Sequence, residues 1–310
     1  SLEPSLSGGA GPSIKLGTQK SVFTMVDKFI KYALHPIILA CVLIAWLFNL
    51  ESPVFYLLVL LSVHSLLGAL EYWKPARPGW VVPAWPKLFN VVLVVILVMG
   101  AGLVAQLYQV HLVTPLSKFR ENMSLDIWPH SWPLIVQVFL VFFTSELLWY
   151  WIHRAEHRWH FVWRVSGHGA HHSFKKLNAL NAGLNHPLEL FFLAVPAALM
   201  ELIFGVGPAA AGATILLVTQ ATIAHTNLNM NSKGMDLLFT TNRHHIRHHS
   251  VVLEESNTNY GCATLLWDRV FGTFADSFTV DVGVGPTEPT LAQKFLMPVR
   301  EPGDTTVAPG

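Results

Sequence analysis

Long apolar runs constrain this chain more than any other feature of its sequence. A helix needs roughly 20 predominantly apolar residues to cross the hydrocarbon core of a bilayer. Only 13% of the 310 residues are charged, about half the share usual in soluble domains, and the mean hydropathy is +0.43. We therefore expect an all-α, polytopic integral membrane protein whose helices form a bundle. Four runs have the required length and composition: Tyr32–Phe48, Pro53–Leu70, Leu88–Leu107 and Trp132–Ile152.

Two shorter apolar runs follow, Pro187–Val206 and Pro208–Ala224. The sequence leaves open whether they cross the membrane or form a hairpin that turns back within it. Lys28 and Lys31 precede the first long run, and positive residues favour the cytoplasmic side of a membrane. Four spans would then return the chain to the cytoplasmic face at Ile152.

We expect one membrane-embedded domain over residues 21–280. Residues 1–20 are rich in Gly and Ser and lack an apolar core, which is typical of a flexible segment. Residues 281–310 are rich in Pro, Gly and Thr, so we expect an irregular tail there. The net charge of +1 gives no case for binding nucleic acid, and two cysteines make neither a disulfide framework nor a Cys-rich zinc site.

Histidine is concentrated in one part of the chain: twelve of the sixteen lie between residues 153 and 249. Eight of them form three motifs, HRAEH, HGAHH and the HIRHH part of HHIRHH. Residues three and four apart lie on one face of a helix, so each motif can direct several imidazoles at one point. Imidazole suits Fe, Cu, Zn and Ni. Eight imidazoles exceed what one metal accepts, so we expect two metal ions. The eight are His153, His157, His168, His171, His172, His245, His248 and His249.

The placement of these motifs favours a site at the membrane face. His153 follows the fourth long run directly, and His225 closes the last apolar run. In the four-span topology both reach the cytoplasmic side. Polar residues beside a membrane core indicate function, and a site there could admit a lipid chain from the bilayer.

With these motifs the chain resembles the membrane-bound fatty acid hydroxylase/sterol desaturase superfamily. The resemblance covers roughly Trp132 to Phe274, and rests on HRAEH, HGAHHS, HTN at His225, RHHIRHH and the closing NTNYGCATLLWDRVFGTF. It implies a non-haem di-iron centre on the cytoplasmic side that uses O2 to hydroxylate an unactivated C–H bond of a lipid. That lipid would be a sterol, ether lipid, fatty acyl chain or aminolipid. The ligands carried over are His153, His157, His168, His171, His172, His225, His245, His248 and His249.

Two departures from the family pattern matter. Some members have a further histidine four residues after the one at His225, where this chain has Asn229; our interpretation assigns His186 as the tenth ligand instead. The chain also carries no cytochrome-b5-like haem segment. The resemblance therefore implies a separate electron donor, cytochrome b5- or ferredoxin-like, with its reductase. The expected location is a bacterial inner membrane or the endoplasmic reticulum.

Ligating histidines usually donate their second ring nitrogen to a carboxylate, carbonyl or amide. We expect no separate side-chain base beside the di-iron centre. The side chains expected to support the ligands are His244, Asn181, Asn185, Asn257, Asn259 and Asp268.

Three other functions remain open. The same site could run as a lipid desaturase, which the spacing cannot separate from a hydroxylase. A zinc hydrolase usually has three protein ligands and often an H-E-x-x-H motif, which this sequence lacks. A metal transporter would distribute its ligands along several spans near the membrane midplane.

Overall fold

The computed structural model describes residues 24–50, 52–230 and 233–300. Every regular element within these ranges is a helix, and two isolated β-bridges, Phe239 with Thr264 and Ser250 with Val282, are the only strand-like pairings there. The prediction of an all-α fold is confirmed. The N-terminal segment expected to be flexible, residues 1–20, lies outside the described residues.

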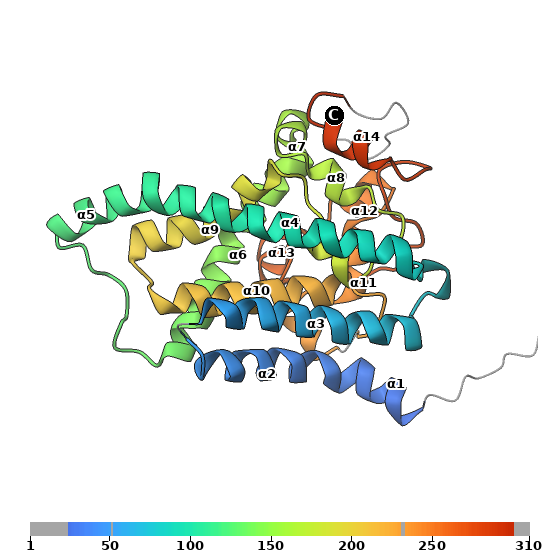
Figure 1. The fold of residues 1–310 in the computed structure, drawn as a ribbon, viewed down its shortest axis with the longest axis horizontal. Helices are drawn as coiled ribbons and strands as arrows, with labels where there is room; N and C mark the ends of the chain where they lie inside the picture. Colours follow the sequence, from blue (N-terminus) through green and yellow to red (C-terminus); the bar gives the residue numbers. More distant parts are fainter. Residues whose placement is uncertain (1–23, 51, 231–232, 301–310) are drawn as a thin grey trace, which may run out of the picture.

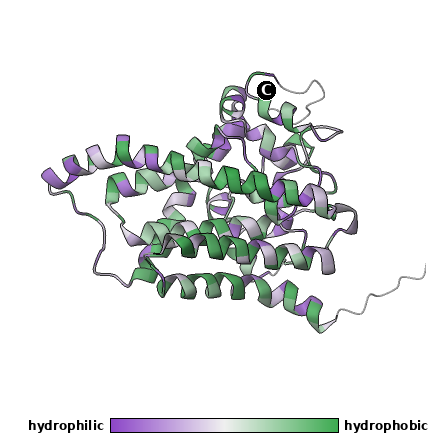
Figure 2. Cartoon of the chain, in the orientation of Figure 1, coloured by the Kyte–Doolittle hydropathy of each residue, from purple (hydrophilic) through white to green (hydrophobic). Residues whose placement is uncertain are grey.

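Four helical segments are long and apolar enough to cross a membrane, which confirms the four predicted spans. Figure 2 shows hydrophobic residues along α2, α3 and α4, whereas hydrophilic residues gather around α7 and α8. The third segment continues beyond its predicted end at Leu107, because a π-helical turn joins α4 to α5 without a break. The segments are α1 (Met25–Phe29), η1 (Ile30–Leu34) and α2 (His35–Leu47); α3 (Pro53–Trp73); α4 (Ala84–Tyr108), η3 (Gln109–Val113) and α5 (Thr114–Asn122); and α6 (Leu134–Arg158).

The two shorter apolar runs form α9 (Glu189–Phe204) and α10 (Pro208–His225). The turn between them contains Gly205 and Gly207, both with positive φ, which glycine adopts without a steric penalty. Twelve of the eighteen residues of α10 are buried, so this helix lies inside the bundle. In Figure 1, α10 runs alongside α3 and crosses α6, and it contacts both helices.

Close packing of α10 against α2 and α6 forms the main apolar core. Trp46, Val138, Phe142 and Leu216 are all fully buried there. A β-carbon at Gly212 would lie 2.5 Å from the Trp46 ring and 2.6 Å from Val138, so only glycine lets the three helices approach this closely.

Short helices cover the ends of α6 and α10 on one side of the bundle (Figure 1). They carry seven of the sixteen histidines. These helices are α7 (His160–Ser166), α8 (His168–His172), η4 (Ala179–Gly183), η5 (Met235–Leu237), α11 (Asn242–His248), α12 (Leu253–Ser256), α13 (Leu266–Phe271) and α14 (Leu291–Leu296); a further 3-10 turn, η2 (Pro78–Trp80), joins α3 to α4.

The expectation of an irregular tail after residue 280 fails for part of its length. Thr290 caps the N-terminus of α14, accepting a hydrogen bond from the Gln293 backbone. Met297 is buried against Trp163 and Ala170. An apolar anchor therefore holds this segment over α8, despite its Pro- and Gly-rich composition.

Candidate metal centre

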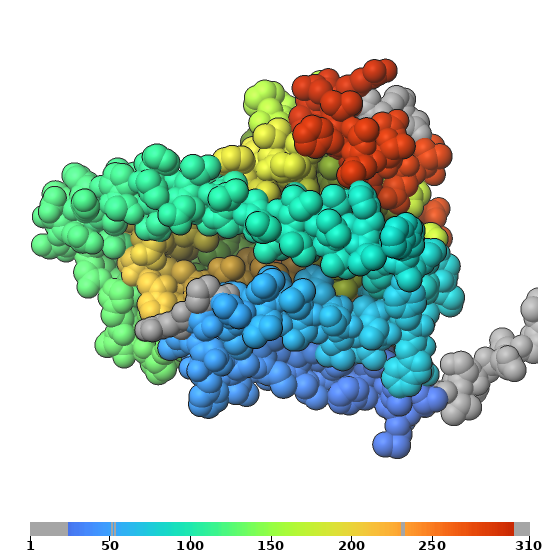
Figure 3. Space-filling view, viewed as in Figure 1, coloured from blue at the N-terminus to red at the C-terminus, as the bar shows by residue number. Residues whose placement is uncertain are grey.

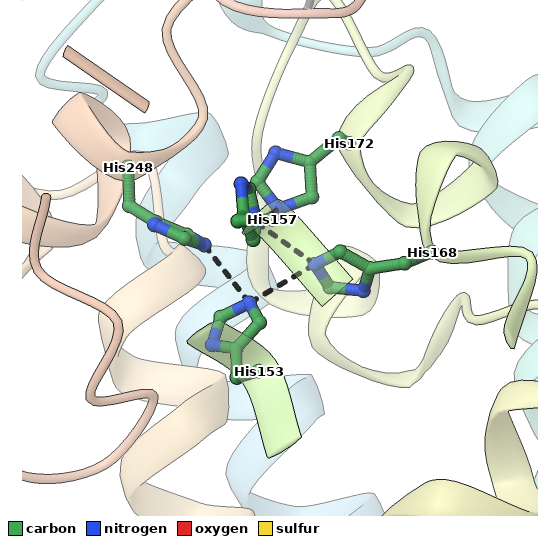
Figure 4. Close-up of side chains that lie close together, drawn as sticks. All are labelled: His153, His157, His168, His172 and His248. Atoms are coloured by element: carbon green, nitrogen blue, oxygen red, sulfur yellow. Dashed lines mark hydrogen bonds between the residues drawn. The ribbon is translucent and has the colours of Figure 1, made fainter. Parts of the chain in front are cut away.

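Nine histidines converge in two groups whose ring nitrogens lie within 4.8 Å of one another. All nine are at most 6% exposed. Group one has five members, which Figure 4 shows pointing toward one another: His153, His157, His168, His172 and His248. Group two has four members: His171, His225, His245 and His249.

Helical spacing explains how each H-x-x-H-H motif serves both groups. His168 and His172, four apart at the two ends of α8, face group one, whereas His171 faces group two. In the last motif His245 and His249 join group two, and His248 joins group one. The sequence predicted one point per motif, but the structure divides each H-x-x-H-H motif between two points and places both histidines of HRAEH in group one.

The tautomers of two group-one rings follow from their outer partners. His153 Nδ1 lies 2.6 Å from the Tyr260 carbonyl oxygen, and His248 Nδ1 lies 3.0 Å from that of Thr258. Carbonyl oxygens only accept, so each Nδ1 carries the proton and each Nε2 presents a lone pair. These two Nε2 atoms are 3.0 Å apart. Facing lone pairs repel unless both bind a cation, so the contacts dashed in Figure 4 fit a metal site.

One ring of group two, that of His225, shows the same pattern. His225 Nδ1 donates to the Ala221 carbonyl one helical turn earlier, at 2.8 Å, so its Nε2 carries a lone pair. That nitrogen lies 2.9 Å from Nε2 of His245 and 3.2 Å from Nε2 of His171. The donor set of both groups is all-imidazole, which fits Fe, Cu, Zn or Ni.

Burial keeps these imidazoles neutral. Desolvation is the largest cause, and the neighbouring histidines add to it because a positive charge on one ring disfavours a charge on the next. Metal binding requires the neutral ring. The rings outside the spanning helices whose pKa is lowered in this way are His168, His171, His172, His245, His248 and His249.

A buried carboxylate that the sequence analysis missed supports His168. Glu189 Oε1 accepts a hydrogen bond from His168 Nδ1 at 2.7 Å, and Glu156 lies 3.7 Å from the same nitrogen. Both glutamates are at most 1% exposed. The available signal was an acidic residue at the edge of an apolar run, which is itself a mark of function in a membrane segment.

The loop 257–261 supplies the carbonyl groups that hold His153 and His248. Asp268 fixes this loop, accepting hydrogen bonds from the backbone N–H groups of Tyr260 and Gly261 at 2.8 and 2.7 Å. Asp268 therefore supports the His153 ring indirectly, by holding the loop backbone whose carbonyl accepts from that ring, rather than by the direct contact we expected.

The other expected supporting side chains do not hydrogen-bond the clustered rings. Asn259, with φ at +55°, instead bridges the His244 carbonyl and the backbone of Ala275. His244 itself contacts Thr241 Oγ1 and Asp276. The remaining amides have backbone partners or none: Asn181 Oδ1 accepts a hydrogen bond from the Asn178 backbone, Asn185 donates to the Ala182 carbonyl, and Asn257 Oδ1 has no hydrogen-bond partner.

His186 is not part of either group, so the geometry gives no support for a tenth ligand at this position. Both ring nitrogens are engaged: Nε2 lies 3.0 Å from the Phe295 carbonyl, and Nδ1 accepts a hydrogen bond from the Leu188 backbone at 3.1 Å. The ring packs against Gly167, where φ is +73° and a β-carbon would lie 2.4 Å from it. His186 therefore joins the turn before α9 to α14 and the turn before α8.

A cavity of about 1170 Å³ leads to the two groups. Residues of α3, α4, α6, α9 and α10 line it, most of them apolar. Figure 3 shows the hollow between α3 and α4, with α9 and α10 visible behind it. Five of the nine clustered histidines border the cavity: His153, His168, His171, His225 and His245.

Comparison with known proteins gives a family match over the part of the chain that holds the two histidine groups. Residues 138–273 match the fatty acid hydroxylase family. The chain is 32% identical over 179 residues to ornithine lipid hydroxylase OlsE of Rhizobium tropici, an alignment covering 56% of this chain and 53% of that protein.

Two other relatives are named as a monooxygenase and an oxidase. Alkylglycerol monooxygenase of Danio rerio is 29% identical over 153 residues, covering 48% of this chain and 32% of that protein. Lathosterol oxidase of Rattus norvegicus is 27% identical over 161 residues, covering 51% and 52%. The chain thus spans between a third and about half of the length of these relatives. No solved structure matches it. Residues 138–273, which contain all nine clustered histidines, are similar to the fatty acid hydroxylase family, and the relatives named above are members of the membrane-bound fatty acid hydroxylase/sterol desaturase superfamily.

Proposed function

We propose that this protein is a membrane oxidoreductase that hydroxylates an unactivated C–H bond of a lipid, using O2 and two iron ions. One observation carries the proposal: two groups of neutral, buried imidazoles border a single apolar cavity between helices long enough to span a membrane. The relatives named above, a lipid hydroxylase, a monooxygenase and a sterol oxidase, support the same class of reaction.

In this proposal group one would hold one iron and group two the other. Bound iron supplies the activation of O2 and the removal of hydrogen from carbon, which no side chain can perform. The overall reaction joins one oxygen atom to the substrate carbon and releases the other as water. It consumes two electrons and two protons, and we propose that the electrons come from a separate cytochrome b5- or ferredoxin-like protein with its reductase.

The chain's own residues orient the ligands and exclude water. The Tyr260 and Thr258 carbonyls fix the rings of His153 and His248, and Glu189 fixes that of His168. Apolar side chains line the cavity that leads to the rings, so a C–H bond can approach while bulk water is kept away.

The substrate in this proposal is an amphiphile with a long apolar chain. The named relatives act on an ornithine lipid, an alkylglycerol and a sterol, according to their names. The cavity opens sideways between α3 and α4, which favours a flexible chain that enters from the bilayer.

We also propose that the metal centre lies on the cytoplasmic side. Lys74 and Lys87 flank the connection between α3 and α4, at the end of the bundle where Glu71 hydrogen-bonds the backbone of Asn227, two residues after His225. Positive residues in short connections favour the cytoplasm. The membrane would be a bacterial inner membrane or the endoplasmic reticulum.

Mass spectrometry of lipids after expression under 18O2 tests the proposal. We expect one labelled oxygen atom in a lipid product. A new double bond without label would instead indicate a desaturase working at the same site. Product formation without O2 uptake would indicate a hydrolase.

Variants in each group complete the test. His171→Ala in group two and His248→Ala in group one should each abolish the product. His130→Ala is a matched control, because His130 is exposed and pairs with Asp126 away from the site. Unchanged product in the first two variants would contradict the assigned centre.

A further inference from the structure

The cavity has a defined direction, because the metal groups lie at one end of it. Along α10 the lining residues run from Ala210 to the last residue, His225. Along α6 they run from Val141 to His153, and along α9 they begin at Glu189, the partner of His168. On each of the three helices, the row of cavity-lining residues therefore has one of its ends at the histidine groups. It does not continue past them.

A polar rim of Tyr72 and Lys87 borders the cavity at the same end. The link is Glu71: one carboxylate oxygen accepts hydrogen bonds from the backbone of Ala179 and Asn227 at 2.7 and 3.0 Å, and the other pairs with Lys87 Nζ at 3.0 Å. Asn227 follows His225 by two residues. The rim is thus joined to the second histidine group by a short, buried connection.

Lys87 has hydrogen-bonding capacity left at this rim. Its ammonium has three N–H donors, and the described contacts are the ion pair with Glu71 and the face of the Tyr72 ring, 4.6 Å from the ring centre. The side chain is 15% exposed and borders the cavity. It can donate to an anionic oxygen of a bound molecule.

The opposite end of the cavity lies far from the metal groups and has no cationic group among its described lining residues. Leu57 on α3, Tyr108 at the end of α4, and Gly207 before α10 line it there. Eighteen residues of α10 separate Gly207 from the end of the helix, which corresponds to about 27 Å. This length exceeds half the thickness of a bilayer core of roughly 30 Å.

We propose that the lipid binds with its polar head at the Tyr72–Lys87 rim and its chain along the cavity toward Tyr108, so that oxidation falls on a carbon close to the head group. The head group is one with a carboxylate or phosphate oxygen that Lys87 can bind. This inference rests on the proposed function and adds the direction of the substrate and the position of attack. The chain enters through the opening between α3 and α4 (Figure 3).

Photocrosslinking to the metal-free protein tests the direction without any turnover. The probes are two acylated amino acid lipids, one with a diazirine at the methyl end of its chain and one with a diazirine next to the head group. We expect the first to label peptides containing Tyr108 or Gly207, and the second to label the peptide containing Trp149, near His153. The reverse pattern, or equal labelling of both regions by each probe, would overturn the proposal.

The position of the hydroxyl group gives a second test, with lipids that share one head group and differ in chain length. We expect the hydroxyl at a constant distance from the head group. A constant distance from the methyl end would refute the proposal and leave the proposed function intact. If no lipid is oxidised while the crosslinks match our expectation, the proposed function fails and the binding direction stands.

A variant at the far end of the cavity tests whether this end limits the length of the lipid chain without changing the carbon that is hydroxylated. Ala105→Phe, which narrows the cavity near Tyr108, should reject the longest chains without moving the hydroxyl on the shorter ones. Leu103→Phe is its control, because Leu103 is 69% exposed on the same helix and does not line the cavity. Identical chain-length profiles in both variants would count against the proposed direction.

Lys87→Gln tests whether Lys87 at the rim binds the anionic head group. We expect KM for carboxylate- or phosphate-bearing lipids to rise roughly tenfold with a much smaller change in kcat, since a charge-assisted hydrogen bond is lost. Lys87→Arg should restore most of the affinity, and Lys118→Gln, outside the cavity, should change neither constant. Equal losses of kcat in Lys87→Gln and Lys87→Arg, with KM unchanged, would indicate a structural role only.

Discussion

His168 Nδ1 lies 2.7 Å from Oε1 of Glu189, a carboxylate buried at the start of the next long helix. This contact joins α8 to α9, and it fixes the tautomer that leaves His168 Nε2 free to bind a metal. The same arrangement, with backbone carbonyls in place of the carboxylate, holds His153, His225 and His248. Four candidate ligands from four helices thus have their Nδ1 atoms held by hydrogen-bond acceptors.

Glu189→Gln should weaken metal binding in group one. The neutral amide can still accept from His168, but without the charge it stabilises the ligating tautomer less. We expect about a tenfold loss of affinity, measured by competition with a chelator. Glu201→Gln is the control, because Glu201 lies at the other end of α9. Equal affinities in the two variants would show that Glu189 does not support the ligand.

Asp268→Asn should destabilise the loop that orients His153. One carboxylate oxygen accepts from Tyr260 N–H and the Thr273 hydroxyl, and the other accepts from Gly261 N–H. An amide cannot accept at both positions, so a buried N–H loses its partner at a cost of about 1–3 kcal/mol. Thermal unfolding in detergent measures the loss. Asp276→Asn, at a half-exposed ion pair with Arg243, should cost less than about 1 kcal/mol.

The metal-free protein should lose stability as the pH falls below about 6.5. Burial lowers the pKa of His244 to about 4 and that of the clustered imidazoles in the same direction. Between the unfolded and folded pKa values the unfolded chain binds more protons, so acid lowers the free energy of unfolding. Each such ring contributes up to about 1.4 kcal/mol per pH unit. A Tm that stays constant from about pH 7 to about pH 5 would contradict this prediction.

Gly212→Ala should destabilise the bundle, since its methyl group would press on the ring of Trp46 and on Val138. Overpacking of this kind costs about 1–3 kcal/mol. Gly102→Ala is the matched control, because nothing lies within 4 Å of its β-carbon. Removing an exposed helical glycine should stabilise the protein by about 0.5–1 kcal/mol. Opposite shifts in Tm are therefore expected from the same substitution at two positions.

The four spans were predictable because their apolar length is a local property. Spacing of three and four residues also sufficed to find His153, His157 and both H-x-x-H-H motifs. What spacing could not show is that each H-x-x-H-H motif divides between two groups, because that depends on where α8 and α11 meet α6 in space.

The supporting contacts were less predictable for the same reason. Glu189 meets His168 across 21 residues of sequence, and His153 meets the Tyr260 carbonyl across 107. Backbone carbonyls leave no mark in a sequence, since every residue has one. His186 illustrates the converse: the sequence analysis assigned it as the tenth ligand, yet Phe295 and Leu188 occupy both of its ring nitrogens.

Iron content and position test the central claim most directly. We predict two iron ions per chain in protein loaded anaerobically with Fe(II), and two separate peaks of anomalous scattering at the iron edge. One peak should lie among the five rings of group one and the other among the four rings of group two. His248→Ala should remove the first peak and His171→Ala the second. A single peak, or iron bound outside both groups, would contradict the account.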